Sequence, residues 1–308
     1  MTNNSLLSCG ALVRRYGRTR ALDGVDLELE SGAPIALVGP NGAGKTTLFS
    51  VLCGYVRPTS GEVRVLGHRP GSAALRGQLG ALPQDASLAP RRTIGAQLED
   101  FARLQGMSRL GARSERERVL DVVDLAGSAR QLPDSLSHGM GKRVAFAQSL
   151  IGSPRLVLLD EPTAGVDPPN VRVIHGLIRE MAGQIDFMIS SHNLDELERL
   201  TDRVVYLDSG RVSSRGAIAS DDGGDSQVGR LTITLETIEA SVASEAADAL
   251  TQLDSVSTCR TTPRGDLVAE VVDEDRAARD VIDWCAEHKV RWRRLARGRS
   301  LEARLYDD

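Results

Sequence analysis

The chain has 308 residues, of which 41% are hydrophobic, 26% charged and 3% aromatic, and its formal net charge at pH 7 is −4. This balance is typical of a soluble globular chain and argues against disorder of the whole chain. The small negative charge gives no general attraction to nucleic acid or anionic lipid. No apolar run approaches the roughly 20 residues that cross a bilayer, and the four scattered cysteines predict neither a zinc site nor a disulfide framework.

Short strand-like runs recur in the first 220 residues, and those that are continuously apolar, such as 35–38, have the pattern of buried strands. In chain order they lie at 12–13, 25–29, 35–38, 156–159, 187–190 and 204–207. A glycine-rich turn and an amphipathic stretch over 46–53 follow the third run, which predicts a strand, a loop and a helix in succession. Because helical patterns also separate the later runs, residues 1–220 are predicted to form an α/β domain with a mainly parallel sheet.

Residues 93–151 differ from the rest of this domain, because they carry several helical patterns and no convincing strand. We therefore expect a helical insertion within the α/β domain. The segment 221–229 is polar and rich in glycine, which is typical of a linker between domains.

Residues 230–308 predict a small accessory α+β domain, of a size at which a domain becomes marginal on its own. The predicted strands are 231–235, 256–260, 267–272 and 290–295, and the predicted helices are 240–253 and 274–287. The stretch 289–304 is rich in basic residues. Contact with an anionic membrane surface, to which each basic residue contributes about 1 kcal/mol, is one interpretation. A solvated face of the domain is the favoured one.

A glycine-rich loop after the run 35–38 matches G-x-x-x-x-G-K-[ST] in the order strand, loop, helix. Glycines let backbone N–H groups curl around phosphate oxygens, and the start of the helix adds a favourable dipole. Lys45 is expected to reach the terminal phosphates, and the Thr46 hydroxyl to bind Mg²⁺. The predicted phosphate-binding residues are Gly39, Asn41, Gly42, Ala43, Gly44, Lys45, Thr46 and Thr47. Taken alone, the loop predicts only a P-loop nucleotide binder, since kinases and GTPases share it.

Two adjacent carboxylates, Asp160 and Glu161, follow the buried run 156–159. Neighbouring strand residues point to opposite faces, so the pair can divide two tasks. One carboxylate can hold a hydrated metal ion while the other faces an attacking water. The pair alone is equally typical of a strand end that meets solvent, and it gains weight only beside the phosphate loop.

A third motif, Leu-Ser-His-Gly-Met-Gly-Lys-Arg at 136–143, lies between these two. With it, the chain resembles the nucleotide-binding subunit of an ATP-binding-cassette (ABC) transporter of the single-cassette exporter type, over roughly residues 5–215. Further elements in family order are Tyr16, Gln84 within 82–84, Asp167 within 164–167 and His192 within 190–193. The resemblance implies a P-loop NTPase core with a parallel sheet, an antiparallel β subdomain and a helical insertion.

The resemblance also implies a division of roles around ATP. Tyr16 stacks on the adenine, and Lys45 neutralises phosphate charge together with the loop amides. The implied Mg²⁺ ligands are Thr46, Gln84 and Asp160, the last two partly through water. Because phosphoryl transfer depends mostly on positioning and electrostatics, loss of Lys45 is expected to be severe.

Catalysis of ATP hydrolysis is implied for Glu161, His192 and Lys45. Glu161 orients and deprotonates the attacking water, and His192 contacts the γ-phosphate. Each residue also has an ordinary structural interpretation when taken alone, and His192 by itself is more typical of a satisfied histidine at a strand end. The order and spacing of all the motifs together favour the catalytic interpretation.

The third motif departs from the family's usual Leu-Ser-Gly-Gly-Gln, because His138 replaces a glycine and Met140 replaces the glutamine. Ser137 and Gly139 remain, and the resemblance implies that they bind the γ-phosphate of ATP held by a second copy of the chain. The two copies are then bound head to tail, and Asp167 links the two sites. The His138 side chain is expected to be tolerated where it points away from the nucleotide, with altered ATP affinity.

A transport function needs a separate integral-membrane permease, which would place this chain peripherally at the cytoplasmic face of the cell membrane. The family pattern puts the docking groove near Gln84–Gln105, with Leu88, Ile94, Leu98 and Phe101 as candidates that equally fit core packing. No nucleic-acid partner is expected. Ser300-Leu301-Glu302 resembles a tail found in many single-cassette exporter ATPases, which modestly favours export.

Two alternative functions stay open. One is a soluble ABC ATPase that is not tied to transport, although such proteins usually carry two cassettes or long coiled-coil insertions. The other is a nucleotide-dependent regulatory module with little turnover, which only His138 and Met140 favour.

Overall fold

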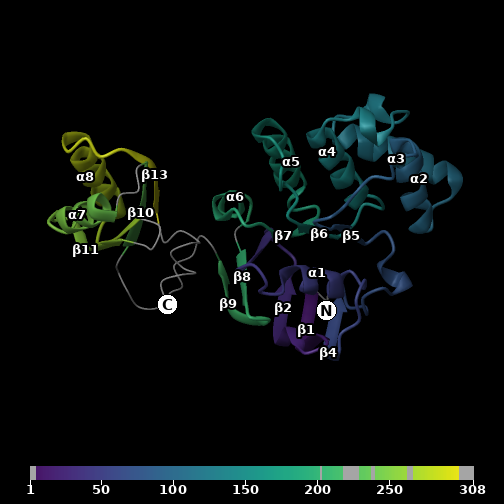
Figure 1. Ribbon diagram of the computed structural model, residues 1–308, viewed down its shortest axis with the longest axis horizontal. Coiled ribbons are helices and arrows are strands. Elements are labelled where there is room, and N and C mark those ends of the chain that lie inside the picture. The colour runs from purple at the N-terminus through teal and green to yellow at the C-terminus, as the bar shows by residue number, and fades with distance from the viewer. Residues whose placement is uncertain (1–4, 202, 218–228, 237–239, 262–265, 298–308) are drawn as a thin grey trace. The chain divides into compact units, whose positions relative to one another are not determined.

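The computed structural model describes residues 5–201, 203–217, 229–236, 240–261 and 266–297. The chain divides into two compact units, Met1–Gly216 and Ala217–Asp308 (Figure 1). The predicted linker lies almost entirely outside the described residues, as does the tail at Ser300-Leu301-Glu302. No helix in the described ranges is long and apolar enough to cross a membrane.

A six-stranded sheet forms the centre of the first unit, with strand order β5-β6-β7-β3-β8-β9. The strands are β3 (Ile35–Val38), β5 (Leu79–Leu82), β6 (Leu156–Asp160), β7 (Asp186–Ser190), β8 (Arg203–Asp208) and β9 (Arg211–Ala217). The pairs β5–β6, β6–β7, β7–β3 and β3–β8 are parallel. Every residue of β3 and β6 is buried, as expected for strands that are covered on both faces. Both strands therefore end at the same edge of the sheet.

A three-stranded antiparallel sheet, of order β2-β1-β4, packs beside this centre. Its strands are β1 (Ser5–Tyr16), β2 (Thr19–Glu30) and β4 (Ser60–Val65). In β2, buried and exposed residues alternate from Val25 to Glu30, the pattern of a strand with one face on a core. The buried side chains of this sheet share one hydrophobic core with α1 (Lys45–Leu52) and the central strands.

Helices form a separate group over residues 93–151, with no strand in that stretch (Figure 1). The group contains α2 (Ile94–Leu104), α3 (Arg109–Val122) and α4 (His138–Ser149), and each begins after a residue whose hydroxyl accepts a backbone N–H, the usual helix start. Two further helices, α5 (Pro168–Met181) and α6 (Leu194–Leu200), belong to the α/β part. The parallel sheet, the antiparallel strands and the helical insertion confirm the predicted fold class.

Two contacts with no side chain between them join the segment 77–80, which leads into β5, to the segment 149–152 at the far end of α4. A Cβ atom built on Gly80 would lie 1.9 Å from the Ser149 carbonyl oxygen. A Cβ atom built on Gly152 would lie 2.4 Å from the Gly77 Cα. The backbones touch at both places, and only glycine permits that approach.

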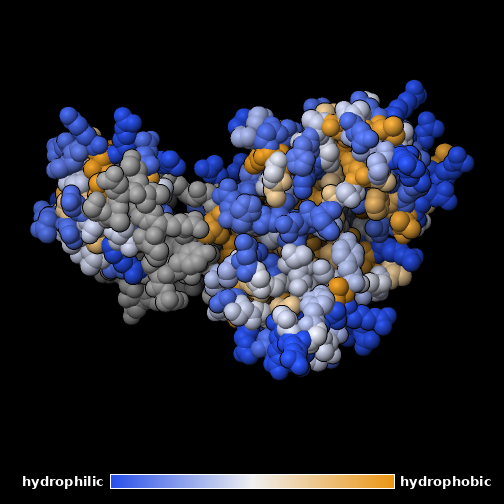
Figure 2. Space-filling view, viewed as in Figure 1, coloured by the Kyte–Doolittle hydropathy of each residue, from blue (hydrophilic) through white to orange (hydrophobic). Residues whose placement is uncertain are grey.

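Two expected groove residues belong to the core of the insertion. Ile94 and Leu98 are 0% and 1% exposed, so they cannot form a free surface. Leu88 and Phe101 are half-buried. Figure 2 shows hydrophobic side chains gathered among hydrophilic ones over the helical insertion, and the exposed apolar residues of that region are Leu104, Leu110 and Leu132.

The second unit is an antiparallel sheet of order β11-β12-β10-β13 with two helices. Its elements are β10 (Gly229–Leu235), α7 (Ala240–Leu250), β11 (Val256–Thr261), β12 (Leu267–Val271), α8 (Glu274–Glu287) and β13 (Trp292–Arg297). Buried side chains from both helices and from β10, β11 and β12 form its own hydrophobic core. This is the small α+β arrangement that the sequence predicts.

Candidate functional site

The loop after β3 takes a shape that two glycines make accessible. Gly39 has φ 154°, and a Cβ atom there would lie 2.0 Å from the Leu207 carbonyl oxygen. Gly44 has φ 107°, and a Cβ atom there would lie 2.4 Å from the Ala21 carbonyl oxygen. Since neither position accepts a side chain, the loop packs directly on the backbone of β2 and β8.

Lys45 opens helix α1 and folds back over the loop. Its Nζ donates hydrogen bonds to the carbonyl oxygens of Gly39 at 2.6 Å and Pro40 at 3.0 Å. Burial lowers the pKa of Lys45, while the nearby carboxylates of Glu161 and Asp160 act in the opposite direction. The structure thus brings the loop cation and the two predicted carboxylates into one electrostatic environment.

Asp160 is the last residue of β6 and is only 3% exposed. Its Oδ1 accepts a hydrogen bond from the Ser190 hydroxyl at 2.5 Å. Its Oδ2 is buried and has no hydrogen-bond partner in the part of the chain that the structure describes. A buried carboxylate oxygen without a donor is costly, and it fits a divalent cation, which prefers oxygen ligands.

Glu161 follows in a left-handed backbone conformation, with φ 53°. Its N–H bonds to the carbonyl oxygen and to the hydroxyl oxygen of Ser190, each at 3.1 Å. Its Oε2 lies 2.8 Å from Nδ1 of His192, whose side chain is 72% exposed. Two predicted catalytic residues therefore meet, although 31 positions separate them.

A hollow of about 270 Å³ collects most of the predicted phosphate and metal ligands. Its lining residues are Ala21, Asn41, Gly42, Gly44, Lys45, Thr46, Thr47, Gln84, Asp160 and Glu161. The three expected Mg²⁺ ligands, Thr46, Gln84 and Asp160, are all among them. The hollow combines one ammonium group, a helix start and two carboxylates, which suits a phosphate chain with a metal ion.

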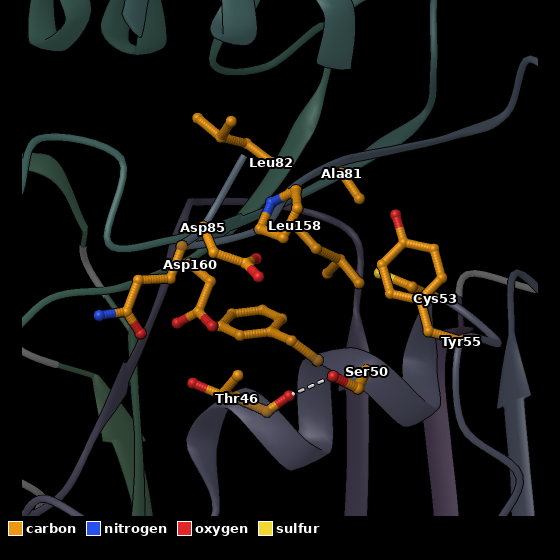
Figure 3. A pocket seen from close by; sticks show the side chains of 12 residues that line it. Thr46, Ser50, Cys53, Tyr55, Ala81, Leu82, Asp85, Leu158 and Asp160 are labelled. Atoms are coloured by element: carbon orange, nitrogen blue, oxygen red, sulfur yellow. Dashed lines mark hydrogen bonds between the residues drawn. The ribbon is translucent and has the colours of Figure 1, made fainter. Parts of the chain in front are cut away.

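A larger cavity of about 700 Å³ shares these three residues and continues away from the loop (Figure 3). Thr46 and Asp160 lie at one end, and Cys53 and Tyr55 lie at the other. Burial raises the pKa of both the Cys53 thiol and the Tyr55 phenol to about 12, so both groups are uncharged near neutral pH. This end of the cavity therefore offers an uncharged lining.

The motif at the start of α4 lies against the segment 164–167. Ser137 caps the helix through its hydroxyl, and Gly139 is buried against Asn170, whose Nδ2 would lie 2.2 Å from a Cβ atom at Gly139. Asn170 donates a hydrogen bond to Asp167 at 2.8 Å. His138 directs its Nε2 toward Gly165 in the same segment, 3.5 Å from a Cβ atom built there.

Six predicted nucleotide-binding residues are not among the described residues that line the loop hollow. Gly39 and Ala43 belong to the loop itself, and the other four are Tyr16, Ser137, Gly139 and Asp167. Tyr16 ends β1 with 47% of its surface exposed, and the Arg14 guanidinium lies 4.4 Å from its ring centroid. One face of the ring is thus covered by a cation from the chain itself.

Sequence reasoning missed Ser190, whose hydroxyl donates to the Asp160 carboxylate and accepts from the backbone N–H of Glu161. It also assigned no function to Glu196 or to Thr163, His175 and Ser191, each of which forms a hydrogen bond with the Glu196 carboxylate. The sole available signal was position, because Ser190 and Ser191 directly precede His192.

Comparisons with known proteins agree with the motifs. Residues 22–164 match the family of sequences described as ABC transporter. Daunorubicin resistance ATP-binding protein DrrA3 of Streptomyces coeruleorubidus is 36% identical over 218 residues, which cover 69% of this chain and 69% of that protein. Nod factor export ATP-binding protein I of Ralstonia nicotianae is 34% identical over 68% of this chain and 67% of its own length.

Methionine import ATP-binding protein MetN of Mesorhizobium japonicum is 32% identical over 68% of this chain and 60% of its own length. A solved structure described as the ATP-binding subunit of an ABC transporter superimposes with a TM-score of 0.61 at 29% identity. That match covers 69% of this chain and 90% of the other. The predicted P-loop fold is thereby confirmed.

Proposed function

The chain belongs to the ABC transporter family, and from this premise we propose that it binds and hydrolyses ATP to power transport through a separate membrane permease. The observation that carries the proposal is that Lys45 and Thr46 of the loop line one hollow together with Asp160 and Glu161, and that Glu161 contacts His192. Phosphoryl transfer depends chiefly on positioning and on charge stabilisation, and this arrangement supplies both.

The chain's own groups would hold ATP at both ends. Loop N–H groups and the start of α1 receive the phosphates, and Lys45 adds a positive charge at the β- and γ-phosphates. Tyr16 stacks the adenine on the ring face that Arg14 leaves open. Thr46, Gln84 and Asp160 would hold Mg²⁺, which when bound adds charge stabilisation at the transferring phosphoryl group.

Hydrolysis would rest on Glu161 and His192. The Glu161 carboxylate orients the attacking water and accepts its proton, a form of help that contributes about 10²–10⁴-fold to the rate. His192 contacts Glu161 through Nδ1 and presents the rest of its exposed ring to the γ-phosphate.

A second copy of the chain would complete each ATP site. Ser137, Gly139 and Asp167 line no part of the loop hollow of their own chain within the described residues. In a head-to-tail pair, Ser137 and Gly139 of one copy approach the γ-phosphate held by the other, with α4 adding its positive end. ATP then binds the closed pair better than the open one, so hydrolysis opens the pair.

The permease would dock at the cavity that runs from Gln84 to Cys53 and Tyr55. This cavity joins the uncharged lining around Cys53 and Tyr55 to Gln84, a proposed metal ligand. This places the chain peripherally at the cytoplasmic face of the membrane. The Nod factor export relative supports an export direction, and it is slightly more similar than the methionine import relative, at 34% against 32% identity.

A regulatory module with little turnover is the second candidate, and His138 and Met140 favour it. The His138 Nε2 lies 3.5 Å from a Cβ atom built on Gly165, so the third motif lies close to the segment 164–167. Phosphate release by the chain assembled with its permease separates the two functions. Release above the rate of the Glu161→Gln variant supports the transport ATPase, and release equal to it supports the regulatory module.

The decisive experiment compares Glu161→Gln with the native chain. The variant is expected to bind ATP, to release phosphate about 10²–10⁴-fold more slowly and to accumulate as a dimer in size-exclusion chromatography with ATP. Glu180→Gln, an exposed position on α5, is the matched control and should behave as the native chain does. Turnover of Glu161→Gln equal to the native rate would remove Glu161 from this role.

A further inference from the structure

Glu196 on α6 is a buried carboxylate that none of the motifs explains. It is 8% exposed and accepts hydrogen bonds from Thr163 Oγ1 at 2.5 Å, His175 Nε2 at 2.6 Å and Ser191 Oγ at 3.2 Å. Burying a charge is costly unless hydrogen bonds replace its water. Three side-chain donors do so here, which makes this a built arrangement.

The three donors come from segments that carry the proposed reacting groups. Thr163 lies two residues after Glu161, and Ser191 lies directly before His192. His175 lies on α5, the helix that begins directly after Asp167. One carboxylate therefore ties together the segments that bear the proposed base, the γ-phosphate contact and the link between the two copies.

The segment that bears His192 is fixed on both sides of that residue. The N–H of Asn193 bonds to Ser191 Oγ at 3.1 Å, and Oδ1 of Asn193 accepts from the N–H of Glu196 at 3.3 Å. The His192 side chain itself is largely exposed, and its contact with Glu161 is the bond that places it. The backbone of His192 is thus held by α6 while its ring reaches the site.

We propose that Glu196 is a positioning residue for ATP hydrolysis, which holds the His192 segment against the Glu161 segment through Ser191 and Thr163 and anchors both to α5 through His175. The inference rests on the proposed function. Glu196 lies outside the nucleotide hollow, yet in this proposal it fixes the 2.8 Å contact between His192 and Glu161. Small misplacements of reacting groups slow catalysis strongly.

The proposed role of Glu196 requires an ionised carboxylate, and a neutral side chain of the same volume would not fill it. Burial alone would raise the pKa of Glu196, but hydrogen bonds from His175, Thr163 and Ser191 hold it below its ordinary value. Glutamine at position 196 has nearly the same shape, but its amide nitrogen donates hydrogen bonds. It would therefore face one of the three donor side chains with no acceptor between them. His175 must carry its proton on Nε2 to bond to the carboxylate.

The test uses a matched pair at Thr163 together with Glu196→Gln, in the full chain assembled with its permease. Thr163→Ser keeps the hydroxyl, and Thr163→Val keeps the shape without it. We expect Thr163→Val and Glu196→Gln to lower kcat by about 10- to 100-fold, with the KM for ATP within about twofold of native. Thr163→Ser and the exposed control Glu180→Gln should keep a native kcat.

Hydrogen exchange on the same proteins gives a readout that needs no turnover. Faster exchange in 191–193 and 163–167 of Thr163→Val, with unchanged exchange in β3, supports the coupling. Equal kcat for Thr163→Val and Thr163→Ser, or equal exchange in the native chain and Glu196→Gln, overturns it. A native chain that releases no phosphate contradicts the proposed function instead, and the exchange comparison then decides the coupling.

Discussion

The Ser190 hydroxyl contacts both acidic residues of the site, because it donates to Asp160 Oδ1 and accepts from the backbone N–H of Glu161. Ser190→Ala removes both bonds and leaves Asp160 buried without a side-chain donor. We expect the free energy of unfolding to fall by about 1–3 kcal/mol, measured by urea denaturation. Ser114→Ala, an exposed position on α3, is the control and should change it little. An equal effect of both substitutions would contradict the role of Ser190.

The lowered pKa of Glu196 predicts a pH dependence with a definite sign. A carboxyl whose pKa is lower in the folded chain than in the unfolded one contributes stability above its unfolded pKa, near about 4.3. That contribution is lost as the pH falls through the folded pKa. Glu196→Gln should therefore cost more stability at pH 7 than at about pH 3.5, measured by urea denaturation at both values. A cost that does not change with pH would contradict the ionised state.

The motifs predicted every described residue that lines the hollow except Ala21, because each motif is continuous in sequence. Ser190, Thr163 and Glu196 could not be predicted, since their bonds join positions that are about 30 residues apart. A serine or glutamate gives no periodic signal of its partners. The meeting of Glu161 and His192 followed only from the resemblance.

At the scale of elements, substitution by alanine is expected to have opposite effects at two glycines, one at a backbone contact and one within a helix. Gly80 lies where β5 touches α4, whereas Gly176 lies exposed within α5 with nothing within 4 Å of a Cβ atom. Gly80→Ala should destabilise strongly, because its Cβ atom would overlap a carbonyl oxygen. Gly176→Ala should stabilise by about 0.5–1 kcal/mol through helix propensity. Thermal unfolding measures both, and a rise in Tm for Gly80→Ala would contradict the described contact.

In the first unit the sequence predicted the strands with continuous apolar runs, such as β3 and β6, and the strand β2, whose apolar residues alternate with acidic ones over 25–29. It did not predict β4, β5 or β9. β5 has only four residues and contains Gly80, which is unfavourable in a strand by propensity and is there for close packing. β4 starts with exposed polar residues and is an edge strand, so its apolar signal is confined to Val63 and Val65. Helix α7 ends at Leu250, three residues before the predicted end.

At the scale of the whole molecule, two separate hydrophobic cores predict two units that fold on their own. A shortened chain of residues 1–220 should keep the ATP affinity of the full chain, because every residue of the loop hollow lies within it. Equilibrium binding of a fluorescent ATP analogue to both chains measures this. A loss of affinity greater than about tenfold, or 1.4 kcal/mol, would show that the second unit supports the site.

The two glycine contacts between the segment 77–80 and the segment 149–152 have a mechanical consequence. Flexible side chains can absorb a small sliding motion between packed elements, but touching backbones cannot. A tilt of α4, whose first turn carries Ser137, is therefore expected to drag β5 with it. Gln84 lies two residues past the end of β5 and lines the hollow. A force applied to the helical insertion is therefore expected to move Gln84, one of the proposed Mg²⁺ ligands, as β5 moves with α4.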